Sequence, residues 1–263
     1  GVGLRLYRVK LPSTEAVADL AGFVGTRGLS VFEHFVVSTQ ATPIANISPD
    51  DLPPPEPETE YPVVGIIDSG TDPDNKFLQA WVVDRDETDV PRIDQDNNHG
   101  SLVTGLIVNG RGLNHDLPGF PPVRAKVVDV VAYPSTGVRE DVLLDTIRRA
   151  LLKYPKVKIW NLSLNSTNSH VVNERFSTFA IALDGVQDQF DVTIVNSAGN
   201  FLQRPAHPWP RPDLKQLDRI LAPADSLRAI TVGAQAHISH KGACAKVGEP
   251  APFTRKGPGA AFV

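Results

Sequence analysis

From residue 63 onward, short apolar runs alternate along the chain with longer amphipathic segments. The runs fall at residues 63–67, 125–132, 157–162, 192–196 and 228–234, and the amphipathic segments at 100–108, 139–153 and 173–190. A run that is apolar at successive positions is typical of a strand buried on both faces, whereas the amphipathic spacing indicates a helix. This alternation predicts an α/β fold with a doubly wound, mainly parallel sheet and helices on both faces.

The first 62 residues follow a different pattern. Residues 4–9 and 29–37 are strand-like, and a helix is predicted between them, over residues 13–23. Residues 1–42 are therefore expected to form a small N-terminal βαβ appendage. Seven prolines interleave with acidic residues in the next segment, 43–62, which predicts an extended linker that does not pack. Residues 63–263 are expected to form the main domain, which lacks its C-terminal part.

Composition narrows the class of protein. The 263 residues are 41% hydrophobic and 21% charged, and the net charge of −4 gives no indication of a nucleic-acid partner or an anionic membrane. No apolar run approaches the ~20 residues that span a bilayer. Cys244 is the single cysteine, so an internal disulfide is excluded. The lack of methionine indicates an excised or processed segment, and nothing indicates the cellular compartment.

Polar residues follow three of the predicted strands directly. Asp68 ends the first apolar run, residues 163–165 (Ser-Leu-Asn) follow the third, and residues 196–200 (Asn-Ser-Ala-Gly-Asn) follow the fourth. Because the carboxyl ends of parallel strands share one rim of a sheet, these side chains are expected to converge. His99 lies at the mouth of the predicted helix 100–108 and is expected at the same rim.

A histidine and a carboxylate at one rim can form the base half of a hydrolytic triad. The carboxylate of Asp68 would accept the Nδ1–H of His99, which leaves the other ring nitrogen to take a proton from a nucleophile. The side-chain amide of Asn200 can donate to a developing oxyanion. Taken singly, each of these residues also has an ordinary explanation as a turn or helix-capping residue.

Taken together, the motifs resemble those of the subtilisin-like serine proteases (subtilases, peptidase family S8). The motifs are residues 64–70 (Val-Gly-Ile-Ile-Asp-Ser-Gly), 99–105 (His-Gly-Ser-Leu-Val-Thr-Gly), 161–164 (Asn-Leu-Ser-Leu) and 197–200 (Ser-Ala-Gly-Asn). Segments 229–234 and 253–258 match those that usually follow in the family. The resemblance spans roughly residues 60–258, and it is carried by the order Asp…His…Asn rather than by any single motif.

The resemblance implies a serine endopeptidase that hydrolyses peptide bonds. Asp68 would orient His99, His99 would act as general base and then as general acid, and Asn200 with a backbone N–H would hold the oxyanion. Residues expected to bind substrate are Ser163, Leu164 and Asn165, which would pair with an extended peptide as an added strand, and Ser197, Ala198 and Gly199, which would wall the P1 pocket. Strand addition uses main-chain hydrogen bonds, so the expected substrate preference is broad or unknown.

One part of the family pattern is missing from these 263 residues. The nucleophilic serine of the family lies in a Gly-Thr-Ser motif, and this sequence contains no Gly-Thr-Ser. We therefore expect the serine of the Asp-His-Ser triad to lie outside the given chain, and the chain by itself to be inactive. Two alternatives stay open: a serine segment carried on a separate processed piece, or a catalytically inactive subtilase-fold protein that binds peptides or serves as a scaffold.

The expected partners also follow from the resemblance. They are a polypeptide substrate and an intramolecular, propeptide-like unit at residues 1–42, with no nucleic acid and no membrane. A cluster of acidic residues at 84–96 favours a solvated loop that lines the cleft, and a structural Ca²⁺ ion is the alternative explanation. No other metal or cofactor is expected.

Overall fold

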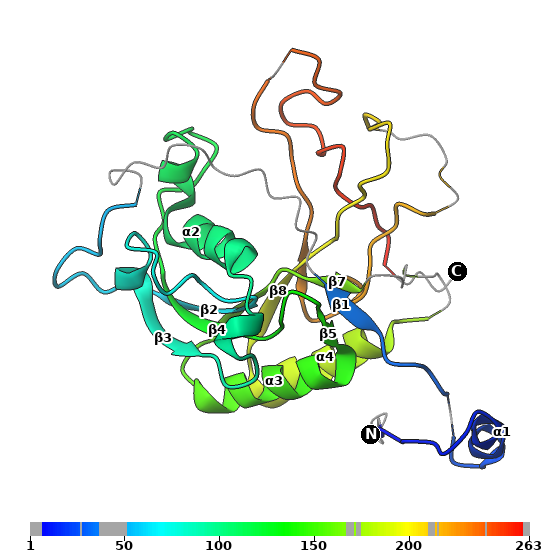
Figure 1. The fold of residues 1–263 in the computed structure, drawn as a ribbon. Helices are drawn as coiled ribbons and strands as arrows, with labels where there is room; N and C mark the ends of the chain where they lie inside the picture. The colour runs from blue at the N-terminus through cyan, green and yellow to red at the C-terminus, as the bar shows by residue number, and fades with distance from the viewer. Residues whose placement is uncertain are drawn as a thin grey trace.

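The computed structural model describes residues 7–26, 28–36, 52–166, 171, 175–209, 214, 216–239 and 241–259. Its main body is a six-stranded sheet flanked by helices (Figure 1). In spatial order the strands are β3 (Val82–Asp86), β4 (Lys126–Val131), β2 (Val63–Asp68), β6 (Ile159–Leu162), β8 (Thr193–Ser197) and β9 (Ile230–Val232). All of these neighbours pair in parallel, which confirms the predicted fold class.

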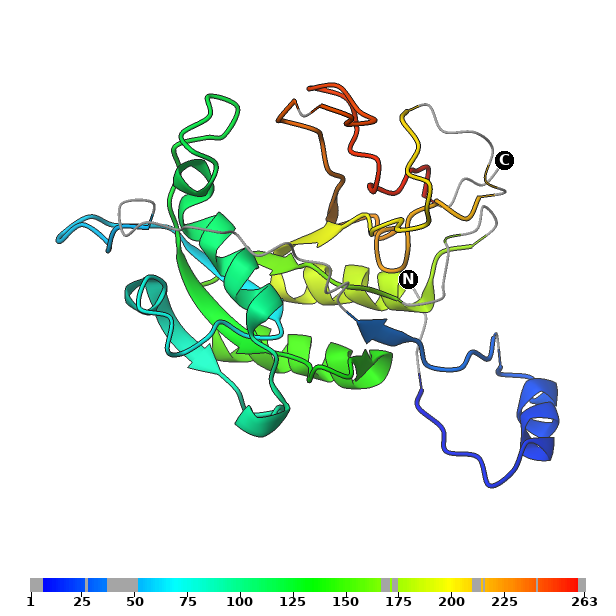
Figure 2. The same cartoon turned by 45° about the horizontal axis from the view of Figure 1, so that its top comes forward.

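Helices cover both faces of this sheet. Figures 1 and 2 show α2 (Asn98–Leu113) on one face and α3 (Glu140–Lys153) with α4 (Thr178–Phe190) on the other. Two short 3₁₀ helices, η1 (Gln79–Trp81) and η2 (Arg92–Asp94), flank β3. The strands and helices predicted after residue 62 are all present, although the last helix begins at Thr178 rather than at residue 173.

The alternation of side chains along β2 places the polar end of this strand toward α2. Ile66 belongs to the hydrophobic cluster that includes Val108 of α2, whereas Ile67 belongs to the larger cluster on the side of α3 and α4. Since successive side chains of a strand point to opposite faces, Asp68 shares the α2 face with Ile66. Gly65 lies on the opposite face, where a Cβ atom would come 2.1 Å from the ring of the fully buried Trp160.

Strand β3 corrects the prediction of a solvated acidic loop up to residue 96. The strand is short, polar and at the edge of the sheet, and edge strands carry charged residues because one side faces water. Three carboxylates in and after this strand contact other side chains: Asp84 contacts Tyr154, Asp86 contacts Lys153, and Asp89 contacts Arg149. These three carboxylates are therefore paired with other side chains and do not form a free acidic surface.

The N-terminal segment contributes one helix and one strand to the described residues. Helix α1 (Glu15–Gly22) buries no residue and stands apart from the sheet in Figure 1. Strand β1 (His34–Val36) lies between β5 (Val138–Arg139) and β7 (Asn165–Ser166) and is antiparallel to both. The first predicted strand, 4–9, falls partly outside the described residues, and residues 7–10 are not in a strand. The second is three residues long and pairs with the main body instead of within an appendage.

The predicted linker is partly packed. Residues 43–51 lie outside the described part of the chain, but Leu52 is buried in the cluster on the α2 side. The indole N–H of Trp81 donates to the carbonyl of Pro53 at 2.9 Å, and the ring of Tyr61 packs edge-on against that of Trp81. The few apolar residues of this segment therefore anchor it to the body, which the prediction of a linker that does not pack did not include.

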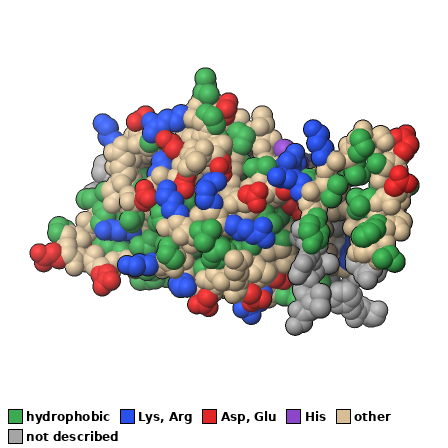
Figure 3. Space-filling view, turned by 90° about the horizontal axis from the view of Figure 1, so that it is seen from below, with side chains coloured by type: hydrophobic (Ala, Val, Ile, Leu, Met, Phe, Trp, Pro, Cys, Tyr) green, Lys and Arg blue, Asp and Glu red, His purple; other side chains and the backbone are tan. Residues whose placement is uncertain are grey.

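On the face beneath α3 and α4 (Figure 3), the described side chains form no large patch of a single charge. Figure 3 shows acidic and basic side chains interspersed there. Among the described residues, no helix combines the length and apolar character needed to cross a membrane.

Candidate active site

The carboxylate of Asp68 and the imidazole of His99 meet at the carboxyl end of β2. The Nδ1 atom of His99 lies 2.8 Å from Oδ1 and 3.0 Å from Oδ2 of Asp68. The aspartate side chain is fully buried, whereas that of the histidine is 20% exposed. An ionised carboxylate only accepts hydrogen bonds, so Nδ1 carries the proton and Nε2 keeps a lone pair. A histidine in this state can accept a proton from a group that approaches from solvent.

Glycine allows the helix of His99 to approach the turn that follows Asp68. A Cβ atom on Gly100 would lie 2.2 Å from the carbonyl oxygen of Gly70, and Gly70 itself has a φ of +92°. Two hydrogen bonds join the same parts: Asn97 Nδ2 donates to the carbonyl of Ser69 at 3.0 Å, and the N–H of Gly100 donates to Ser69 Oγ at 3.2 Å. These contacts set the position of His99 relative to β2.

A second buried carboxylate lies behind the Asp68–His99 pair. Asp129 of β4 is paired with Arg85 of β3 at 2.5 Å and accepts the N–H of Thr71 at 2.9 Å. Burial raises the pKa of Asp129 to about 6; the Thr71 N–H and the Arg85 charge oppose this effect, and the charge of Asp68 adds to it. Arg85 also binds the carbonyl of Thr71, so this network holds the turn that follows Asp68.

The predicted substrate-binding residues fall into two groups that the fold brings together. Asn165 Nδ2 donates to the carbonyl of Ser197 at 2.9 Å, and Ser197 Oγ donates back to Asn165 Oδ1 at 2.7 Å. Ser163 Oγ bonds to Asn161 rather than to this pair. Leu164 is 1% exposed and packs in the main core, so only its backbone could meet a ligand.

The predicted oxyanion asparagine lies just beyond β8. Ala198 is buried and Gly199 has a φ of +96°, which turns the chain toward Asn200. Asn200 pairs with Thr254, and its carbonyl accepts the Nε–H of Arg255 at 2.9 Å. The side chain of Asn200 is exposed. The two downstream segments of the sequence resemblance are thus brought against the oxyanion motif.

Strand β1 lies at the end of the stretch that the sequence predicts to pair with a bound peptide. Val36 lies opposite Asn165 and Phe35 opposite Ser166, and on the other side Phe35 lies opposite Val138. Of the three residues expected to pair with a substrate, Asn165 is therefore already paired with a segment of the same chain.

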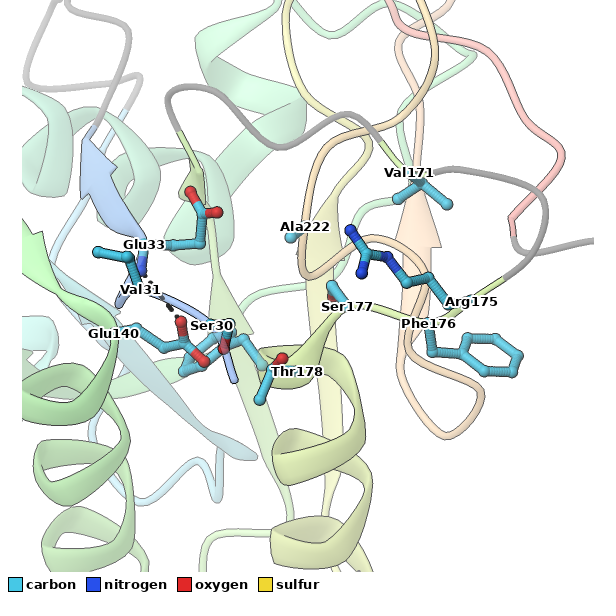
Figure 4. Close-up of a pocket in the computed structure, with 11 residues that line it drawn as sticks. Ser30, Val31, Glu33, Glu140, Val171, Arg175, Phe176, Ser177, Thr178 and Ala222 are labelled. Atoms are coloured by element: carbon cyan, nitrogen blue, oxygen red, sulfur yellow. Dashed lines mark hydrogen bonds between the residues drawn. The ribbon is translucent and has the colours of Figure 1, made fainter. Parts of the chain in front are cut away.

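A cavity of about 150 Å³ lies beside β1, between the first turns of α3 and α4 (Figure 4). Two of its lining residues bond reciprocally: the N–H of Glu33 donates to Glu140 Oε2 at 3.1 Å, and the N–H of Glu140 donates to the carbonyl of Glu33 at 2.9 Å. Burial, and then the negative charge of Glu33, raise the pKa of the Glu140 carboxyl. The cavity belongs to the docking site of the N-terminal segment.

Sequence reasoning missed Tyr133, Arg85 and Asp129. Tyr133 OH donates to Asp68 Oδ1 at 2.9 Å. Tyr133 follows β4, so the rule that strand ends share a rim could have indicated it. Asp129 sits inside an apolar run as an isolated acid, which was a further signal. No group of three or more His, Cys, Asp or Glu side chains able to hold a metal occurs among the described residues.

Comparison with known proteins agrees with this architecture. The profile of the subtilase family (Peptidase_S8) matches residues 60–262, so the chain belongs to the subtilase family. Comparison with curated proteins gave no significant match.

Solved structures of several proteases are similar to this chain. The prenylagaramide maturation protease PagA is 16% identical with a TM-score of 0.46, and the match covers 75% of this chain and 58% of PagA. The epidermin leader peptide processing protease EpiP from Staphylococcus aureus is 18% identical with a TM-score of 0.45. The match covers 71% of this chain and 48% of EpiP. MycP1 with its N-terminal propeptide removed is 17% identical with a TM-score of 0.44. The match covers 76% of this chain and 62% of MycP1. The chain thus spans about half to three fifths of these proteins.

Proposed function

We propose that this chain is part of a serine endopeptidase. It carries the aspartate and histidine of an Asp-His-Ser triad, together with the asparagine that holds the oxyanion. The observation that carries the proposal is the hydrogen bond between the buried Asp68 and the partly exposed His99. The carboxylate holds the imidazole in the tautomer that accepts a proton at Nε2 and stabilises the imidazolium that forms. The nucleophile would come from a Gly-Thr-Ser segment, which these 263 residues do not contain.

In this mechanism His99 takes the proton of the serine hydroxyl as its oxygen attacks the peptide carbonyl carbon. The negative charge that develops on the carbonyl oxygen is met by the side-chain amide of Asn200 and a backbone N–H. His99 then gives its proton to the leaving amine, and water hydrolyses the acyl-enzyme by the same steps. The substrate would be an extended polypeptide, paired through its backbone with residues 163–165, while residues 197–199 wall the pocket for its P1 side chain.

We further propose that the N-terminal segment is a propeptide-like occupant of this peptide site. The support is the placement of β1 between β5 and β7, where Val36 pairs with Asn165, one of the residues assigned to substrate. The ion pair between Arg8 and Asp141 adds a second connection between this segment and the start of α3. Removal of the segment would open the edge to other peptides.

A fluorophosphonate probe tests the proposed activity in the full-length protein that contains this chain. We expect covalent labelling of one serine, located by mass spectrometry, and loss of labelling in His99→Ala. His115→Ala, at an exposed histidine beyond α2, is the matched control and should be labelled normally.

Failure of the folded, processed full-length protein to react would overturn the endopeptidase proposal. It would favour the second candidate, an inactive subtilase-fold protein that binds peptides or serves as a scaffold. The β5–β1–β7 ladder, in which an extended segment is already held, is the observation that supports this candidate.

A further inference from the structure

Tyr133 contacts the aspartate of the candidate site from the neighbouring strand. It follows the carboxyl end of β4, it is 3% exposed, and its hydroxyl lies 2.9 Å from Asp68 Oδ1. The same oxygen accepts the N–H of Ser69 at 2.7 Å and lies 2.8 Å from His99 Nδ1. Asp68 Oδ1 is therefore shared by two donors besides the histidine.

The phenol is a fixed donor at this position. Burial first, and then the negative charge of Asp68, raise the pKa of Tyr133 well above its ordinary value, so the hydroxyl keeps its proton. The ring belongs to the main hydrophobic cluster, which holds the hydroxyl in place. An ionised carboxylate cannot donate, so the proton of this bond comes from Tyr133.

We infer that Tyr133 is a positioning residue that restrains the Asp68 carboxylate and sets how strongly it stabilises a protonated His99. A hydrogen bond donated to the carboxylate disperses its negative charge, and a more dispersed charge attracts the imidazolium less. Tyr133 would thus hold His99 closer to the neutral state that a general base requires. The role of this tuning in catalysis rests on the proposed function, but the tuning itself is a property of the folded chain.

NMR titration of isotope-labelled histidine in the 263-residue chain tests the inference without any need for turnover. The His99 resonances are assigned as those lost in His99→Gln. We expect Tyr133→Phe to move the His99 titration midpoint upward by roughly 0.3 to 1 pH unit, because the bare carboxylate attracts the imidazolium more strongly. An unchanged midpoint in a folded Tyr133→Phe chain would overturn the inference, even if the variant were less stable.

Two further variants separate tuning from loss of packing. Tyr154→Phe is the matched control, since it also removes a tyrosine–carboxylate hydrogen bond, at Asp84, and should leave the His99 midpoint unchanged. Site-specific 3-fluorotyrosine at position 133 keeps the ring but is a stronger donor, so it should move the midpoint downward. A shift in the same direction as Tyr133→Phe would contradict the assigned role, and this variant serves if Tyr133→Phe does not fold.

The charge of Asp129, a neighbour of Asp68, can be removed in the same experiment. Asp129 of β4, paired with Arg85 of β3, interacts electrostatically with Asp68, and burial raises the pKa of Asp129 to about 6. The Tyr133→Phe shift should therefore persist in an Asp129→Asn background, and its disappearance there would overturn the inference. The fluorophosphonate test remains independent: a chain that shows the midpoint shift but no labelled serine in the full-length protein would contradict the proposed function alone.

Discussion

The rings of Phe35 and Phe179 pack with their centroids 4.7 Å apart, and the two side chains are at most 1% exposed. Phe35 belongs to β1 and Phe179 to α4, so this contact buries an N-terminal strand in the core of the main body. The N-terminal segment is thus held by an apolar anchor as well as by its backbone ladder.

Phe35→Ala is expected to loosen β1. Truncation of a buried phenylalanine costs about 3–5 kcal/mol, which corresponds to amide exchange at residues 34–36 faster by at least about 100-fold. Hydrogen exchange with mass spectrometry measures this, and Phe23→Ala, at a 65% exposed side chain, is the control. Unchanged protection of residues 34–36 in Phe35→Ala would show that the ladder alone holds the strand.

Gly100→Ala is expected to destabilise the fold and disturb the Asp68–His99 pair. The added Cβ would lie 2.2 Å from the carbonyl oxygen of Gly70, so helix α2 or the turn must shift, at a cost of about 1–3 kcal/mol. Gly110→Ala in the same helix meets no atom within 4 Å and should be neutral or stabilising by up to ~1 kcal/mol. Urea unfolding of the two variants gives the comparison, and equal stabilities would contradict the close approach.

Asp129→Asn is expected to flatten the pH dependence of stability. The pKa of Asp129 is raised from 3.8 to about 6 in the folded chain, so between these pH values the folded state retains a proton that the unfolded chain releases. The free energy of unfolding therefore falls as pH rises from about 4 to 6, by about 3 kcal/mol from this group, and then levels off.

Urea unfolding at several pH values from 4 to 7 measures that slope in the wild type and in Asp129→Asn. The control is Asp141→Asn, because bonds to Arg139 and then Arg8 lower the pKa of Asp141 to about 2 and its contribution is lost only below pH 4. Parallel curves for the wild type and Asp129→Asn would rule out the raised pKa.

Asn200→Ala is expected to slow turnover without unfolding the protein, because the side chain is exposed. Loss of one oxyanion donor lowers kcat by about 10²–10³-fold in subtilisin, and we adopt that magnitude for this family member. Steady-state assays of the full-length protein on a peptide substrate test it. Asn114→Ala is the control. The side-chain amide of Asn114 donates to the carbonyl of Gly110, near the C-terminus of α2. A kcat close to the wild-type value would remove Asn200 from the oxyanion site.

Patterns of apolar residues predicted the central strands and the helices because these elements are buried on at least one face. β3 was missed because an edge strand needs few apolar residues, and the sequence Val-Val-Asp-Arg-Asp is also typical of a polar loop. The packing of Leu52 was missed because one apolar residue among prolines has no periodicity. Local pattern alone cannot reveal a contact that depends on a distant partner.

The sequence alone predicted the parallel sheet and the family resemblance, and it identified Asp68, His99 and Asn200 as candidate site residues. These follow from local order along the chain, since strand ends share a rim and each motif is contiguous. The sequence carried signals for Tyr133 and Asp129, but only the tertiary structure showed which groups they contact and that β1 fills the edge between β5 and β7. The physical reason is that burial and pairing between distant segments depend on how the strands are ordered across the sheet, which no local pattern encodes.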